Sequence, residues 1–183
     1  HTFLMGSRLD DAVGLFATNT RDWLCGTQSV QFDLSAGWNL ISIPVASDES
    51  VGAVFGDAAA RATLKAGPFW TWDPATPCFS QESDDTCPTE LLAGWVFSAG
   101  GGVTRATVGF AAGADEVSLV AGWNLVGTVR PCPVPDCAEL SLPLWAWDAQ
   151  KQRYVSLADG ATMIPGKAYW AFALAPCTLT LAE

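Results

Sequence analysis

The chain has 183 residues, of which 50% are hydrophobic and only 15% charged, and its formal net charge is −10. Such a length suits one domain or two small ones with a sizeable core. The negative charge, without any cluster of Lys and Arg, argues against nucleic acid and anionic lipid as partners. No run reaches the roughly 20 apolar residues that a membrane helix needs, so we expect no direct membrane insertion.

Residues 1–28 are predicted to form an N-terminal arm ahead of the main fold. Leu9, Val13, Phe16 and Trp23 have the spacing of one helix face. The alternative is an extended arm that adds a strand to the sheet edge of a neighbouring subunit or domain. Either form makes the arm a candidate contact with a partner.

The sequence Ala-Gly-Trp-Asn-Leu occurs twice, at 36–40 and at 121–125. Each copy follows a stretch of alternating apolar and polar residues, which is typical of a half-buried strand. Apolar side chains continue on both faces of 38–45, which indicates a strand covered on both sides. Each glycine suits a turn of positive φ, each tryptophan suits the core, and each asparagine can bond the backbone of a turn.

One helix is predicted in the first half, over 47–67, with Ser47 or Asp48 as its cap and Gly67 as its stop. The corresponding place in the second half, 130–143, is rich in proline and leaves room for one helical turn at most. We therefore expect the helix to be an addition to a fold built of strands.

Further segments recur in the same order, which predicts an internal two-fold repeat. Pro-x-Trp-x-Trp-Asp stands at 68–73 and 143–148, the segment 91–99 aligns with 163–171, and threonine-rich strands close the halves at 103–109 and 177–183. We assign 29–112 to the first repeat and 113–183 to the second, and expect them to pack as one compact unit. The predicted fold class is mainly β, a β-sandwich or a barrel-like fold, with one or two short helices.

The six cysteines predict three disulfides and an oxidising compartment. Two pairs bracket short loops, Cys78–Cys87 and Cys132–Cys137, and the remaining two cysteines then form Cys25–Cys177, which ties the ends together. A zinc site is the alternative, but the spacing from Cys78 to Cys87 is too long for half of a structural zinc site. We therefore predict no metal site.

This pattern of strands resembles the Gly-Trp-Asn-Leu-Ile repeats of large secreted and cell-surface proteins of bacteria and archaea. The resemblance rests on the motif at 37–41 followed by Pro44, and on the later Trp-x-Trp and Gly-aromatic strands. It covers 30–110 and 117–182, although the second copy of the motif lacks the proline. The resemblance implies a secreted or cell-surface location, and it implies no catalytic residues.

The sequence offers no recognisable catalytic apparatus. His1 is the only histidine, and no phosphate loop, zinc-protease motif or EF-hand is present. A glycosidase needs only two carboxyl groups, but no acid/base pair is singled out, because Asp73 and Asp148 both follow Trp-x-Trp, where an aspartate suits a turn. We therefore predict no enzyme and no cofactor.

Nine tryptophans give the clearest functional lead. The Trp-x-Trp pairs at 70–72 and 145–147 each share one face of a strand. Because both repeats keep the pair, we expect it to pack in the core between them. Trp23, Trp95 and Trp170 have no aligned tryptophan in the other repeat, and we predict them as surface contacts for a ligand or partner.

Two functions from different classes follow. The first is a non-enzymatic structural or adhesive module of a cell-surface protein or fibre, whose partners are neighbouring domains or subunits. The alternative is a carbohydrate-binding module in which exposed tryptophans stack on a polysaccharide. Residues duplicated in both repeats indicate architecture more than a binding site, which favours the first.

Overall fold

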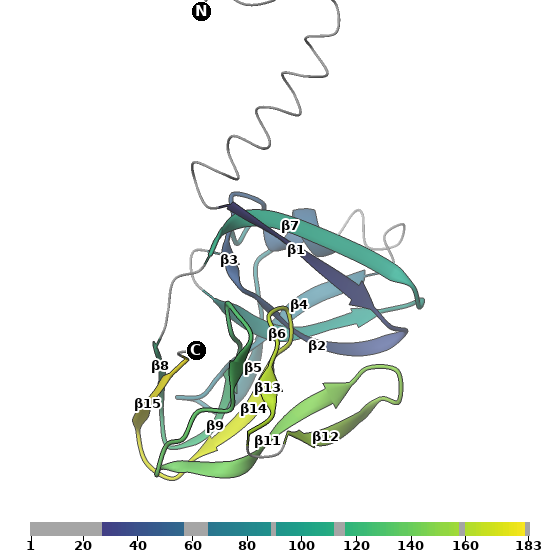
Figure 1. The fold of residues 1–183 in the computed structure, drawn as a ribbon. Coiled ribbons are helices and arrows are strands. Elements are labelled where there is room, and N and C mark those ends of the chain that lie inside the picture. Colours follow the sequence, from purple (N-terminus) through teal and green to yellow (C-terminus); the bar gives the residue numbers. More distant parts are fainter. Residues whose placement is uncertain (1–26, 57–65, 89–90, 112–115, 158–159, 182–183) are drawn as a thin grey trace, which may run out of the picture.

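The computed structural model describes residues 27–56, 66–88, 91–111, 116–157 and 160–181 (Figure 1). Of these residues 59% lie in strands and 4% in a single short helix. The strands form several antiparallel sheets, none of which closes into a barrel. The predicted mainly-β fold class is therefore confirmed.

The first half of the described chain builds two sheets. A three-stranded sheet has the order β1-β7-β3, and a four-stranded sheet has the order β2-β6-β4-β5. Their bounds are β1 (Thr27–Leu34), β2 (Gly37–Ile43), β3 (Val45–Ala46), β4 (Ala66–Asp73), β5 (Cys78–Gln81), β6 (Leu92–Ser98) and β7 (Val103–Ala111). The strands β1, β3 and β7 lie at the top of Figure 1.

The second half builds a four-stranded sheet of order β9-β14-β11-β12 and two small sheets, β8-β15 and β10-β13. Their bounds are β8 (Glu116–Leu119), β9 (Gly122–Val126), β10 (Cys132–Pro133), β11 (Leu140–Asp148), β12 (Arg153–Leu157), β13 (Thr162–Met163), β14 (Tyr169–Ala173) and β15 (Cys177–Thr180). In both four-stranded sheets the Gly-Trp-Asn-Leu strand lies at one edge and the strand after Trp-x-Trp at the other. The internal repeat itself stays a prediction.

The turn before each Gly-Trp-Asn-Leu strand forms as predicted. Gly37 and Gly122 have φ of 92° and 102°, a region that disfavours residues with a side chain. The Asn39 side chain accepts a hydrogen bond from the Ser35 N–H and donates one to the Ser35 carbonyl, both at 2.9 Å. Asn124 makes the same two bonds to the residue four positions before it, at 3.0 and 2.8 Å. Each asparagine thereby closes the turn that leads into the strand.

The helix α2 (Val51–Phe55) begins later than predicted. Its cap is Ser50, whose side chain accepts a backbone N–H of the helix at 3.2 Å, and it ends at Gly56 with φ of 101°. Ser47 was an expected cap, but its hydroxyl instead contacts Thr107 of β7 at 2.9 Å. The rest of the predicted helix, 57–65, and the predicted helix face in the arm lie outside the described residues.

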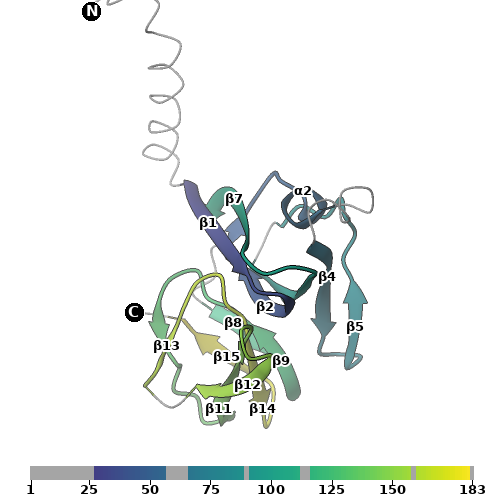
Figure 2. The same cartoon turned by 90° about the vertical axis from the view of Figure 1, so that its right-hand side faces the viewer.

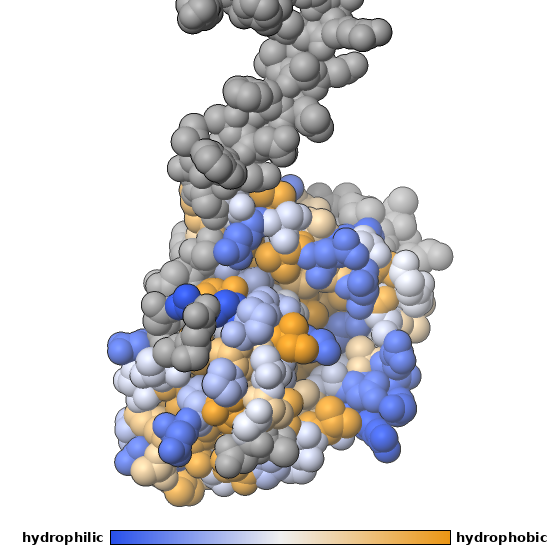
Figure 3. Space-filling view, viewed as in Figure 1, coloured by the Kyte–Doolittle hydropathy of each residue, from blue (hydrophilic) through white to orange (hydrophobic). Residues whose placement is uncertain are grey.

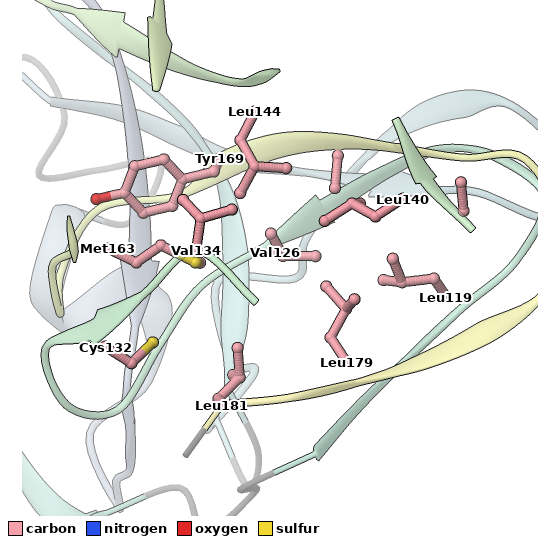
Figure 4. Close-up of a cluster of buried hydrophobic side chains, with 12 residues drawn as sticks. Leu119, Val126, Cys132, Val134, Leu140, Leu144, Met163, Tyr169, Leu179 and Leu181 are labelled. Atoms are coloured by element: carbon pink, nitrogen blue, oxygen red, sulfur yellow. The ribbon is translucent and has the colours of Figure 1, made fainter. Parts of the chain in front are cut away.

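Each half has its own hydrophobic core. The first core packs α2 against β1, β2 and β4, and α2 lies next to β4 in Figure 2. The second core lies between β8, β9, β11, β14 and β15 and contains Tyr169, Met163, Leu144 and Val134 close together (Figure 4). On the outer face seen in Figure 3, apolar residues reach the surface among hydrophilic ones.

No disulfide joins the described cysteines in the structure, so the predicted pairs Cys78–Cys87 and Cys132–Cys137 are not formed there and stay predictions. All five described cysteines carry free thiols. The strand β5 holds Cys78, whereas the Cys87 sulfur lies 3.5 Å from the carbonyl of Asp48 near α2. Cys132 is buried in the second core, and its sulfur contacts Thr128 at 3.4 Å. Cys25 lies outside the described residues, so the Cys25–Cys177 pair stays a prediction.

Candidate functional site

All eight described tryptophans gather where the two four-stranded sheets meet. With Phe79 and Tyr154 they line two adjoining clefts. The Trp170 cleft, about 540 Å³, is lined by Trp72, Phe79, Trp123, Trp145, Tyr154 and Trp170. The Trp95 cleft, about 490 Å³, is lined by Trp38, Trp70, Phe79, Trp95, Trp147 and Tyr154. Because Phe79 and Tyr154 belong to both, the two clefts form one aromatic surface.

Strand register places these rings on a common face. Trp70 pairs with Trp95 across β4 and β6, and Trp145 pairs with Trp170 across β11 and β14. Side chains two residues apart on a strand point to the same side, so the second tryptophan of each Trp-x-Trp lies on that face too. The hairpins β4–β5 and β11–β12 then add Phe79 and Tyr154.

The clefts are built from both sheets because the second tryptophan of each Trp-x-Trp reaches across. The indole N–H of Trp72 donates to the carbonyl oxygen of Trp123 in β9 at 2.8 Å. The indole N–H of Trp147 donates to the carbonyl oxygen of Trp38 in β2 at 2.7 Å. These two hydrogen bonds hold each hairpin against the other half of the chain.

The tryptophans that we expected at the surface form the floor of the clefts instead. Trp95 and Trp170 are only 8% exposed. Trp95 pairs with Leu40 and Trp170 with Leu125, so both stand opposite the leucine of a Gly-Trp-Asn-Leu strand. The alignment of 91–99 with 163–171 placed Trp95 against Lys167. Strand register instead gives Trp95 and Trp170 the same position relative to the Gly-Trp-Asn-Leu strand of their own sheet. Trp23 lies outside the described residues.

The tryptophans of the Gly-Trp-Asn-Leu strands are exposed, which corrects their expected place in the core. Trp38 is 42% exposed and Trp123 is 43% exposed, and both form walls of the clefts. Trp145, Phe79 and Tyr154 are also exposed, while the other rings of the Trp-x-Trp pairs are half-buried. The Trp-x-Trp pairs are thus only partly the core elements that we predicted.

The rings meet edge to face rather than in a flat platform. Trp72 and Trp170 lie 5.3 Å apart between ring centroids with planes at 80°, and Trp95 and Trp147 lie 5.1 Å apart at the same angle. Such contacts are the favoured geometry of aromatic pairs. The walls of the clefts therefore present both ring faces and ring edges.

Two aspartates fix the hairpins that carry the shared rings, as predicted for turn residues. Asp73 accepts hydrogen bonds from the hydroxyl of Thr76 at 2.6 Å and the N–H of Ala75 at 2.9 Å. Asp148 accepts the N–H of Lys151 at 3.0 Å and forms an ion pair with its ammonium group at 3.1 Å. These bonds lower the pKa of both carboxyl groups, chiefly through the Thr76 hydroxyl for Asp73 and through the Lys151 side chain for Asp148.

Polar groups at the clefts are few. Burial raises the pKa of Tyr154, and the adjacent Trp170 indole N–H partly offsets this rise. Gln152 lies just outside the Trp95 cleft, where its side chain accepts the Trp38 N–H at 2.8 Å and donates to the Trp38 carbonyl at 3.0 Å. The clefts therefore present aromatic rings much more than hydrogen-bonding groups.

Sequence reasoning missed Phe79 and Tyr154 as members of the site. The signal was present, because each lies six residues after the aspartate that ends its Pro-x-Trp-x-Trp-Asp motif and each is aromatic. It also missed Gln152, for which the sequence holds no signal, since its partner Trp38 lies more than 100 residues away.

Comparison with protein-family models, with curated proteins and with solved structures finds no match to this chain. Within the described ranges, no three His, Cys, Asp or Glu side chains are grouped so that they could hold a metal ion. No helix in the described part of the chain has the length and hydropathy needed to cross a membrane.

Proposed function

We propose that the chain is a non-enzymatic adhesive module of a secreted or cell-surface protein, and that it holds a polysaccharide in its two aromatic clefts. One observation carries the proposal: ten aromatic side chains from both sheets form two open, adjoining clefts. Aromatic rings pack against the C–H faces of a sugar ring, whose hydroxyl groups then remain in water. Open clefts with few polar groups suit this mode of binding.

The pairing of the clefts favours a polymer over a single sugar. Because the clefts share Phe79 and Tyr154, neighbouring units of one chain can occupy both. A second contact on the same ligand is intramolecular and raises the overall affinity without any new type of interaction. We therefore expect the affinity to rise steeply with the length of the oligosaccharide.

The location follows from the resemblance to Gly-Trp-Asn-Leu-Ile repeats of secreted and cell-surface proteins. The acidic character of the chain is consistent with a role that avoids nucleic acid and anionic lipid. Neighbouring domains or subunits of a surface assembly are the expected partners beside the polysaccharide.

The test is a titration of intrinsic tryptophan fluorescence with a panel of soluble polysaccharides and with oligosaccharides of increasing length. We expect a saturable shift with one sugar class, lost in Trp38→Ala and Trp123→Ala, each of which removes an exposed wall. The matched control is Phe110→Ala, since Phe110 is 49% exposed but lies on β7 outside both clefts. Flat curves across the whole panel would overturn the carbohydrate proposal.

A structural role without a ligand is the second candidate. The observation that favours it is the pair of indole hydrogen bonds from Trp72 and Trp147, which join the two halves. In a surface fibre the exposed rings would then contact a second copy or a neighbouring domain. Sedimentation velocity tests this: concentration-dependent association that Trp38→Ala and Trp123→Ala abolish supports the structural role, and a monomer at all concentrations contradicts self-association.

A further inference from the structure

Two cysteines that the sequence did not pair lie side by side in the second half. Leu140 of β11 pairs with Ala173 of β14, and the ladder continues with a hydrogen bond from the Leu174 N–H to the Glu139 carbonyl at 2.7 Å. Extending this antiparallel path brings Cys137 to the start of β15, where Cys177 stands. The two cysteines are near neighbours and pack against the same core.

The surroundings of the pair are well defined. Both cysteines are half-buried and pack against the second core. The Cys137 sulfur also lies 3.4 Å from a carboxylate oxygen of Glu139. Burial raises the pKa of Cys177, and the contact with Cys137 and the charge of Glu139 raise it further. Cys132 is buried, and its sulfur lies 3.4 Å from the Thr128 hydroxyl.

We propose that Cys137 and Cys177 form a disulfide bond that ties β15 to the loop before β11. The oxidant is a small disulfide such as oxidised glutathione. One cysteine thiolate attacks a sulfur of the oxidant and releases the first glutathione thiolate, and the second cysteine thiolate then attacks the mixed disulfide and releases the other. The two cysteine protons end on the two released glutathiones, and two electrons pass from the protein to the oxidant.

This bond would close a loop of roughly 40 residues and so restrict the unfolded chain. It would also anchor β15, which is held to β8 by a ladder of only four residue pairs. The inference does not depend on the aromatic clefts, and it would stand even if no polysaccharide bound.

The test maps the thiols of the purified full chain after incubation with oxidised glutathione and alkylation of the remaining thiols. Trypsin cuts between Cys137 and Cys177, and a protease that cuts before aspartate separates Cys132 from Cys137 at Asp136. We expect a cross-linked peptide that contains Cys137 and Cys177, which disappears in Cys177→Ser and persists in the exposed control Cys78→Ser.

A thermal measurement adds a second readout. The oxidised chain is expected to melt roughly 5–10 °C above both the reduced chain and Cys177→Ser. A Cys132–Cys137 or Cys25–Cys177 peptide in place of the expected one would overturn the proposal. Complete alkylation of Cys137 and Cys177 in the unaltered chain after oxidation would also overturn the proposal. This mapping needs no variant, so the test remains valid if Cys177→Ser fails to fold.

Discussion

The two four-stranded sheets present the same aromatic face but fill their opposite faces differently. In the first sheet Gly94 stands opposite Ile41, and the ring of Phe69 packs over the space that a side chain would occupy. At the matching place in the second sheet, opposite Val126, stands the buried Tyr169. The two cores thus reach close packing with different residues.

On the aromatic face, in contrast, equivalent positions of the two sheets hold residues of similar size. Trp72 contacts Phe79 in the first sheet, and Trp147 contacts Tyr154 in the second. The distance between ring centroids is 4.9 Å in both contacts. Cores tolerate different solutions provided that the volume is filled. Several rings on the aromatic face are exposed and contribute less to packing, so core packing alone does not account for their common arrangement.

The largest expected effect is the loss of a cleft floor. Trp95→Ala and Trp170→Ala should each destabilise the chain by about 3–5 kcal/mol, because each removes a buried indole from a packed cluster. Guanidinium unfolding followed by far-UV circular dichroism measures this. The exposed Trp38→Ala and Trp123→Ala should cost only about 1–2 kcal/mol, and equal losses in all four variants would contradict the distinction between floor and wall.

The next effect concerns the close approach at Gly94. A Cβ added there would lie 2.4 Å from a carbon of the Phe69 ring and 2.4 Å from the Trp70 carbonyl oxygen. We expect Gly94→Ala to destabilise the chain by about 1–3 kcal/mol, because ring and backbone must both shift. The control is Gly101→Ala, where the nearest atom lies 3.6 Å from the added carbon. A neutral Gly94→Ala in the same unfolding measurement would show that the first core is loosely packed.

The indole hydrogen bonds between the halves give a smaller effect. Trp72→Phe and Trp147→Phe each keep a ring but remove the donor to a backbone carbonyl, at a cost of about 1 kcal/mol. The double variant should lose about the sum of the two, since the bonds join different strands. Differential scanning calorimetry measures this effect. Unchanged melting temperatures in both single variants would show that these hydrogen bonds do not stabilise the contact between the halves.

Local features of this fold were readable from the sequence. Alternating residues predicted β1 and β8, and the turn glycines, the two asparagines and the two hairpin aspartates all take the predicted roles. These features depend on residues within a few positions of each other, so local backbone chemistry decides them.

Features set by distant pairing were not readable. Trp95 and Trp170 hold equivalent positions because of strand register, which in the first sheet joins residues more than 50 positions apart. The sequence alignment matched Gly94 with Gly166 instead, and so it did not place the two tryptophans at the same position. The exposure of Trp38 and Trp123 depends on how much of each indole the opposite half covers. The cysteines illustrate the same limit, because Cys78 and Cys87 are close in sequence but are carried apart by β5.

The smallest expected effect separates the two hairpin turns by pH and salt. Both aspartates have pKa values lowered by folding, so each stabilises the folded chain above its unfolded pKa and loses this contribution as the pH falls below about 4. Asp73→Asn and Asp148→Asn should each flatten the acid limb of melting temperature against pH.

Asp73 is held by a hydroxyl and an N–H, whereas Asp148 also has the exposed Lys151 ammonium. Because salt screens the attraction between two full charges much more than a short hydrogen bond from an uncharged donor, 1 M NaCl should shrink the effect of Asp148→Asn more than that of Asp73→Asn. An equal response of the two variants to salt would show that the ion pair adds nothing to the turn that presents Tyr154.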